Sequence, residues 1–218
     1  ELMVISPDGA YLIMDNYTEN SPIIFGSNSE ISLQFSNVGS ESAENTQLEL
    51  LCNDEFVEII NPIINLGNIL SDQVIEASDI ELQTSPNIPD EHQILINYYL
   101  SSSNEEWEGS FNLIASAPKL EIQNININAT CGTLMPGGIA SISADIINSG
   151  SIALDNPNID VSTNANSNIS EVSQDFVASL FNNQSLSINF DIEIGNGVQL
   201  GTDLNPQIEI TSSDVEGY

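Results

Sequence analysis

The chain has 218 residues with one lysine, no arginine and 32 acidic residues, so its formal net charge at pH 7 is −31. Almost no side chain can neutralise a phosphate, which excludes nucleic acid and anionic membrane surfaces as partners. The acidic residues are spread singly along the chain, which is typical of a solvated, self-repelling surface suited to a salty exterior. A surface loaded with Ca²⁺ is the alternative.

Period-two alternation of apolar residues dominates the chain from its first third onward. Ile31, Leu33 and Phe35 share one face of a predicted strand, and a long later run from Leu186 to Ile194 behaves in the same way. Asn, Gly, Ser, Pro and Asp gather between such runs, and no segment has helical periodicity. The predicted strands are 2–5, 11–14, 31–37, 46–51, 56–60, 74–83, 93–100, 109–115, 119–127, 139–147, 157–162, 169–172, 185–194 and 206–211.

Short strands at this spacing predict an all-β fold of antiparallel, Ig-like β-sandwiches with roughly seven strands each. A long-period repeat indicates that there are two of them in tandem. The segment Ser36–Ser40, with Asn45 beyond it, recurs as Ile147–Ser151 with Asn156, 111 residues later. The predicted domains are residues 1–117 and 118–218, with the boundary at Pro118.

The same offset aligns Ser101–Trp107 with Ser212–Tyr218. In the first domain that segment leads into a further strand, Gly109–Ile114, whereas the second domain reaches position 218 without one. We therefore expect the second domain to lack its last strand, which either lies outside these residues or is supplied by another chain.

The turn after the predicted strand 31–37 has the pattern Asn-x-Gly in both domains. Asn and Gly tolerate positive φ, so the pattern predicts a turn in which these two residues adopt it. With Ala43–Asn45, Ala153–Asn156 and the preceding Leu134–Gly138, it resembles the CARDB-like Ig modules found beside gingipain-type cysteine peptidases and in other large surface proteins of Bacteroidetes.

The resemblance covers nearly the whole chain and implies non-catalytic spacer or binding modules that are exported with a parent protein. The chain departs from the family pattern at Gly138, where an acidic residue is usual. It also departs in the preceding loop, whose Asp, Asn and Gly content is reduced to Asn124, Asn126 and Asn128.

The chain offers little for catalysis. His92 is the only histidine, and its position before a predicted strand is typical of an exposed turn residue. Cys52 ends an apolar alternation and is interpreted as a buried thiol, and Cys131 lies in a loop of the other domain. A disulfide between Cys52 and Cys131 is the alternative. No catalytic, cofactor-binding or metal-binding residue is assigned, and the chain is predicted not to be an enzyme.

Three other patterns favour structural roles over ligand binding. Gly195-Asn196-Gly197 with Gly201 looks like a phosphate loop, but its counterpart Thr84–Asn87 has the composition of a hairpin turn. Trp107, among glutamates 105, 106 and 108, is interpreted as packing at the edge of its domain, with glycan binding as the alternative. Calcium held by a loop containing Asp15, Asn16 and Glu19 is the weakest alternative.

The first residue is Glu1, no signal peptide is evident, and no apolar run is long enough to cross a membrane. These features favour a piece of a longer secreted or cell-surface protein. Four Asn-x-Ser/Thr sequons begin at Asn16, Asn128, Asn168 and Asn183. The function predicted is a non-catalytic stalk or accessory pair that positions a neighbouring domain. The alternatives are a filament or adhesin subunit that completes its fold by strand exchange with copies of itself, and a glycan-binding module.

Overall fold

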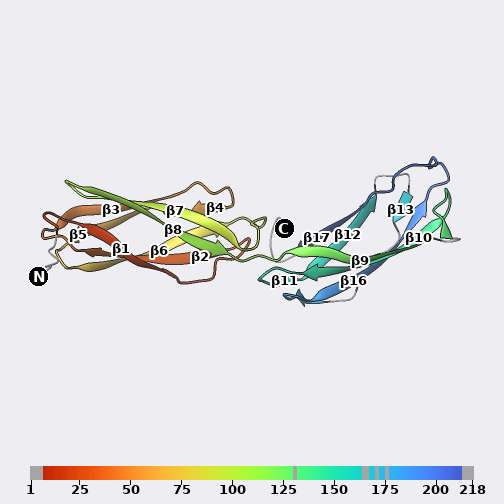
Figure 1. The fold of residues 1–218 in the computed structure, drawn as a ribbon, viewed down its shortest axis with the longest axis horizontal. Helices are drawn as coiled ribbons and strands as arrows, with labels where there is room; N and C mark the ends of the chain where they lie inside the picture. The colour runs from red at the N-terminus through yellow and green to blue at the C-terminus, as the bar shows by residue number, and fades with distance from the viewer. Residues whose placement is uncertain (1–6, 130–131, 164–166, 170–171, 175–176, 213–218) are drawn as a thin grey trace, which may run out of the picture. The chain divides into compact units, whose positions relative to one another are not determined.

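The computed structural model describes residues 7–129, 132–163, 167–169, 172–174 and 177–212 (Figure 1). The chain folds into two compact units, unit 1 from Glu1 to Ser116 and unit 2 from Ala117 to Tyr218. All secondary-structure elements in the described residues are β-strands, which confirms the all-β fold. The predicted strand 2–5 lies outside the described residues.

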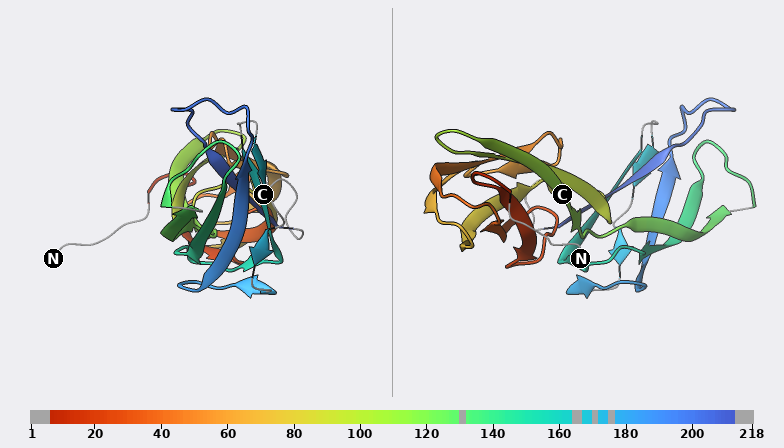
Figure 2. Two further views of the ribbon diagram at one scale, coloured as in Figure 1. Left: turned by 90° about the vertical axis from the view of Figure 1, so that its right-hand side faces the viewer. Right: turned by 60° about the vertical axis from the view of Figure 1, so that its left-hand side comes forward.

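Unit 1 is a sandwich of two four-stranded antiparallel sheets, which Figures 1 and 2 show face to face. The first sheet has the order β1-β2-β6-β4, with β1 Leu12–Glu19, β2 Asn28–Asn37, β6 Val74–Thr84 and β4 Val57–Ile59. The second has the order β5-β3-β7-β8, with β5 Ile63–Ile69, β3 Ala43–Cys52, β7 His92–Ser101 and β8 Glu106–Ala115.

The core of unit 1 follows the sequence pattern. Ile31, Leu33 and Phe35 of β2 are all fully buried, as the alternation predicted. The second sheet contributes Ile94 and Leu113, which are equally inaccessible. Burial of such side chains is the main favourable term in forming a sandwich, at about 1.5–3 kcal/mol for each one.

Among its described residues, unit 2 repeats the first sheet of unit 1 and part of the second. Its main sheet has the order β13-β16-β10-β9, with β14 also paired to β16, and two further pairs stand apart from it. The main-sheet strands are β9 Leu120–Ala129, β10 Ile139–Asn148, β13 Ser167–Ile169, β14 Ser173–Gln174 and β16 Ser185–Ile194. The separate pairs are β11 Leu154–Asp155 with β15 Ser179–Leu180, and β12 Pro157–Thr163 with β17 Pro206–Ser212.

The offset between the units changes along the chain. In the main sheet, the pair Phe35↔Ile75 recurs as Ile146↔Leu186, an offset of 111. In the first strand the offset is 108, since Leu12 lies opposite Asn37 and Leu120 lies opposite Asn148.

In the last strand of unit 2 the offset is 110. Leu48 lies opposite Leu100 in unit 1, whereas its counterpart Ile159 lies opposite Ile210. The alignment of Ser101 with Ser212 was therefore wrong by one residue, and the remainder of that alignment, up to Tyr218, lies outside the described residues. A one-residue slip exchanges the two faces of a strand, and this register keeps Ile208 and Ile210 toward the core.

Two local predictions also need correction. Strand β5 was not predicted, because its apolar residues do not alternate and Gly67 interrupts it at φ 73°. The connection Thr84–Asn87 is not a hairpin turn, because β6 and β7 belong to different sheets. Its counterpart in unit 2 likewise joins β16 to β17 across two sheets.

Candidate functional site

The repeated Asn-x-Gly turn is built around the buried side chain of Asn37, which is 0% exposed. Its Oδ1 accepts hydrogen bonds from the backbone N–H groups of Tyr11 at 3.0 Å and Gly39 at 3.1 Å. Its Nδ2 donates to the carbonyl of Glu41 at 2.8 Å and to that of Ile69 at 3.0 Å. One amide thereby satisfies four backbone groups and joins the start of β1, the turn after β2 and the end of β5.

Asn148 makes the same four bonds in unit 2 and is also 0% exposed. Its Oδ1 accepts from the N–H groups of Lys119 at 3.1 Å and Gly150 at 2.9 Å. Its Nδ2 donates to the carbonyls of Ile152 at 2.8 Å and Leu180 at 2.9 Å. We call each of these arrangements an asparagine hub. The hub explains why this residue recurs in the sequence.

The hub replaces the positive-φ explanation of the motif, which was wrong for both residues. Neither Asn37 nor Gly39 has positive φ. The glycine is needed because a Cβ at Gly39 would lie 2.3 Å from the carbonyl oxygen of Gly9, and one at Gly150 would lie 2.3 Å from the N of Lys119.

Positive φ does recur between the units, but at other positions. Asn45 has φ 54° and Asn156 has φ 44°, at the offset of 111. Asp72 at 61° and Asn183 at 59° form a second such pair, in the turn that also bonds to the hub strand. These short polar residues adopt the left-handed region at low cost.

His92, the only histidine, is not an exposed turn residue. It is the first residue of β7, its side chain is 26% exposed, and its Nε2 lies 2.7 Å from Oδ2 of Asp54. The Phe56 ring packs edge-on against the imidazole, with the ring centroids 5.2 Å apart. No sequence signal pointed to the Asp54 partner, because it lies 38 residues away in the loop after β3.

Cys52, His92 and Asp54 thus belong to one end of unit 1, but their arrangement does not suit nucleophilic catalysis. Cys52 lies opposite Ile96, and the Cα atoms of Ile96 and His92, four residues apart on β7, are separated by about 13 Å. Burial raises the pKa of the Cys52 thiol and the nearby Asp54 charge raises it further, against a hydrogen bond from the Asp54 backbone that lowers it. The thiol is therefore kept protonated, which is the opposite of what an attacking cysteine needs.

Cys52 is half-buried and forms no disulfide within the described residues, whereas Cys131 lies outside them. The alternative of a disulfide between the two is therefore untested.

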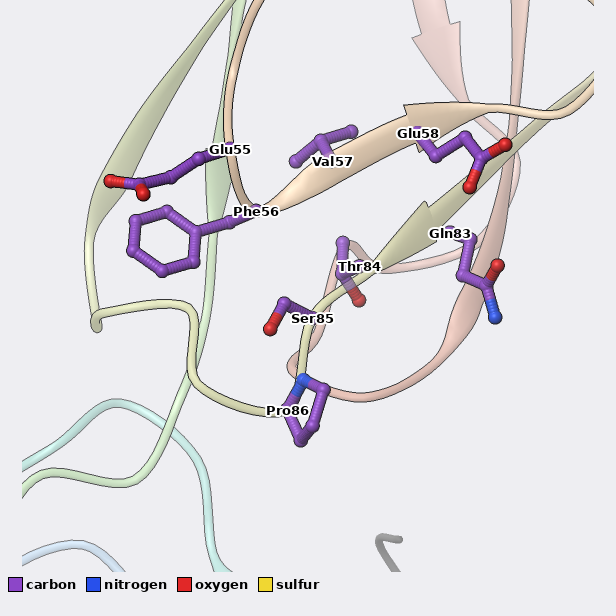
Figure 3. Close-up of a pocket in the computed structure, with 8 residues that line it drawn as sticks. All are labelled: Glu55, Phe56, Val57, Glu58, Gln83, Thr84, Ser85 and Pro86. Atoms are coloured by element: carbon purple, nitrogen blue, oxygen red, sulfur yellow. The ribbon is translucent and has the colours of Figure 1, made fainter. Parts of the chain in front are cut away.

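A hollow of 310 Å³ lies beside this end of unit 1, and Figure 3 shows the residues that line it. Glu55 and Phe56 project from the turn just before β4, while Ser85 and Pro86 come from the turn after β6. The Ser85 N–H donates to the carbonyl of Phe56 at 2.7 Å and fixes the turn against the strand. The walls hold two carboxylates, Glu55 and Glu58, and no basic group, so the charge of the hollow disfavours an anion.

Trp107 borders a larger hollow of 580 Å³ on the second sheet of unit 1. It lies opposite Leu100, which is 1% exposed, so register places its side chain toward the interior. Glu108 lies opposite Tyr99 and shares the outer face with it. By register the aromatic ring and Glu108 belong to opposite faces of β8, although Trp107, Glu106 and Glu108 all border this hollow. Glycan binding there stays untested.

The candidate calcium residues do not form a loop. Asp15, Asn16 and Glu19 all belong to strand β1, and the Ser36 hydroxyl donates to an Asp15 carboxylate oxygen. Asn124, Asn126 and Asn128 likewise lie on strand β9. Within the described ranges, no group of three or more His, Cys, Asp or Glu side chains is arranged to hold a metal ion.

The Gly195–Gly197 segment is followed by strand β17, so no helix N-terminus is present there to bind a phosphate. Gly201 has φ 87°, and a Cβ at either Gly197 or Gly201 would meet open space. The segment is a surface connection between two sheets. Over the described part of the chain, we find no helix with the length and apolar character needed to cross a membrane.

No family model and no curated relative matches the chain. Solved structures similar to it include a protein of unknown function from Porphyromonas gingivalis W83, at 11% identity and a TM-score of 0.32. That match covers 84% of this chain and 83% of the other. Red sea bream transglutaminase is similar at 12% identity, TM-score 0.37, and 94% and 29% coverage. The YadV chaperone is similar at 9% identity, TM-score 0.31, and 94% coverage of both chains. Similarity at this level carries no functional assignment.

Proposed function

We propose that the chain is a non-catalytic pair of Ig-like β-sandwich units that forms a stalk or accessory region of a larger secreted or cell-surface protein and positions a neighbouring domain. The observation that carries the proposal is that the two units repeat the same buried polar framework. The asparagine hubs of Asn37 and Asn148 recur bond for bond.

The chemically distinctive residues do not recur. Cys52 corresponds to Thr163, and unit 2 contains no histidine. A duplication that keeps the framework and not the reactive groups is what a spacer requires. The CARDB-like resemblance supports the same role, and the net charge of −31 disfavours contact between copies along the exposed faces.

Single-molecule stretching of the full chain between two reference domains tests the spacer role. We expect two separate all-or-none unfolding events, each releasing about 35 nm of chain for a unit of this size. The Asn37→Ala substitution should lower the force of one event only, and the exposed control Asn16→Ala should lower neither. Extension of the chain without resistance would contradict a role as a stalk.

Catalysis is tested separately with His92→Ala. Because His92 is bonded to Asp54 and is remote from Cys52, we expect no hydrolytic activity that depends on it. The measurement is turnover of peptide, ester and glycoside substrates by the purified chain. Any activity that this substitution abolished would show that the chain is an enzyme.

A further inference from the structure

The outer face of the second sheet of unit 1 carries apolar side chains where alternation leads one to expect polar ones. Strands β3, β7 and β8 turn every other residue into the core, and the residues between them face outward. Four large apolar residues occupy such outward positions. They are Leu51, Leu95, Tyr99 and Ile114, which are 43%, 49%, 40% and 57% exposed.

The strand register makes these four residues neighbours. Leu51 lies opposite Asn97, and Leu95 and Tyr99 stand on either side of Asn97 along β7, so Leu51 is diagonal to both. Ile114 of β8 is diagonal to Leu95 in the same way. Diagonal partners on one face of a sheet are about 7–8 Å apart, which large side chains span. We call Leu51, Leu95, Tyr99 and Ile114 the apolar band.

The outer face of the first sheet of unit 1 shows the usual pattern and provides a contrast. Its exposed large apolar residues are Ile13 and Val74, which both lie opposite Ser36 at one end of β2. Farther along, the outward positions are polar, as in the pair of Gln34 with Glu76. The apolar band is therefore not a general property of this sandwich. A contiguous apolar patch with a polar rim marks an interaction surface.

Three carboxylates surround the tyrosine at one end of the apolar band. Tyr99 lies directly opposite Glu49 of β3 and Glu108 of β8, and Glu106 stands two residues before Glu108 on the same face. All three glutamates border the hollow of 580 Å³ described above. Within the described residues no cation neutralises them, since both ion pairs found there involve other carboxylates. Like charges placed across neighbouring strands repel one another, and a cation at this point would relieve that repulsion.

Charge indicates what kind of molecule covers this face. A second copy of the chain would bring 32 carboxylates, one lysine and no arginine to the three glutamates, so like charges would meet. A lysine or arginine side chain of another protein has the opposite sign. Its aliphatic stem would pack on apolar surface while its charged end reaches the carboxylates, and a cation over the Tyr99 ring gains a further attraction.

We propose that the outer face of the second sheet of unit 1 is a docking surface for a different protein, which presents apolar side chains to the apolar band and a lysine or arginine to Glu49, Glu106 and Glu108. The surface gives the chain a partner in addition to the neighbouring domain that it positions. It does not depend on the spacer role, because stretching measures the resistance of each unit to unfolding and not the chemistry of this face.

The test is binding of three labelled peptides to the full chain, measured by fluorescence anisotropy. One peptide alternates leucine with lysine, the second alternates leucine with glutamate, and the third alternates serine with lysine. We expect the leucine–lysine peptide to bind at least tenfold more tightly than either of the others. Leu95→Asp should weaken that binding at least tenfold. Val74→Asp, which adds the same charge at an exposed position on the other outer face, should change it much less.

The carboxylates are tested with paired substitutions that remove equal charge. Glu49→Gln combined with Glu108→Gln should weaken binding of the leucine–lysine peptide about tenfold and reduce its dependence on salt. The control combines Glu30→Gln with Glu76→Gln on the outer face of the first sheet, and it should have a much smaller effect. Thermal unfolding of each variant establishes that unit 1 remains folded, so that weaker binding is not loss of structure.

Three results would overturn the proposal. Equal binding of the serine–lysine peptide, or equal weakening by the two glutamate pairs, would mean that the peptide responds only to the net charge of the chain. Failure of the leucine–lysine peptide to bind would mean that the face has no affinity for such a partner. Sedimentation that shows self-association of the chain, lost in the Leu95→Asp variant, would assign the apolar band to a second copy instead.

Discussion

Units 1 and 2 have the same polar framework but differ in how their sandwiches are closed. Each buries an asparagine that satisfies four backbone groups, with bond lengths that agree within about 0.2 Å. Unit 1 adds β8 and buries Phe111, whereas unit 2 leaves Ile125 exposed. The hub geometry is therefore the same in both units, although the strands described around it differ.

The largest effect is expected from removing a hub. Asn37→Ala or Asn148→Ala leaves two N–H groups and two carbonyls without their partners, half of them in buried bonds, which should destabilise the affected unit by about 3 kcal/mol. Hydrogen exchange measured by mass spectrometry assigns the loss to one unit. If Asn16→Ala, which alters an exposed strand position, were equally harmful, the hub would not be the cause.

The closure of unit 1 is tested next, with Phe111→Ala. Truncating this buried ring should cost unit 1 about 3 kcal/mol, because its contacts with Tyr17 and the core are lost and a cavity remains. In unit 2, Ile125 takes the place of Tyr17, the contact of Phe111, and is 63% exposed, so Ile125→Ala should cost less than about 0.5 kcal/mol. Denaturant unfolding of both variants provides the comparison, and similar losses would mean that unit 2 is closed in solution.

A smaller effect is expected from the hub glycines. Gly39→Ala and Gly150→Ala place a Cβ 2.3 Å from backbone atoms that cannot move independently, which should cost about 1–3 kcal/mol in either unit. Gly197→Ala is the control, because its Cβ would meet nothing within 4 Å. The melting temperatures of the three variants measure these losses of stability. An unchanged melting temperature for Gly39→Ala would show that the turn relaxes to accept a Cβ.

The smallest effect concerns pH and belongs to unit 2 alone. Hydrogen bonds from Ser187 at 2.6 Å and Asn124 at 2.8 Å lower the pKa of Asp145 from its ordinary value of 3.8. In unit 1 the corresponding position holds Gln34, which does not ionise. A carboxyl whose folded pKa is depressed contributes stability above its unfolded pKa and loses that contribution as the pH falls through the folded pKa.

We therefore expect Asp145→Asn to destabilise unit 2 by a constant amount from neutral pH down to about pH 5, and by a shrinking amount below about pH 4. Ser187→Ala should reduce this pH dependence, because it removes the donor that lowers the pKa most. Urea unfolding at several pH values measures both effects. A penalty for Asp145→Asn that is the same at pH 3 and pH 7 would contradict the assignment.

Much of the fold could be predicted from the sequence because period two directly reports which face of a strand is buried. Ile31, Leu33 and Phe35 were placed correctly on the core side for that reason. Strand β5 was missed because its burial depends on the neighbouring β3 and not on its own pattern. The register of β17 was also missed, because the match of Ser212 to Ser101 rests on residue identity, whereas packing places Ile210 by the face that it buries.

The candidate site residues divide in the same way. Trp107 was expected to pack at the edge of its domain, and its alternation with Phe111 along β8 places it on the inner face of that strand. The partner of His92 could not be predicted, because Asp54 reaches it only through the pairing of β3 with β7. Sequence spacing carries no information on such a contact between distant loops.

By itself, the sequence determined the all-β class, the tandem repeat and the acidic surface, since these depend on composition and on local periodicity. Only the tertiary structure decided why Asn37 and Gly39 recur, because the four groups that the amide satisfies come from three different strands and turns. It also decided which apolar residues lie open on unit 2, because the exposure of Ile125 depends on whether another strand covers it and not on its own neighbours in the chain.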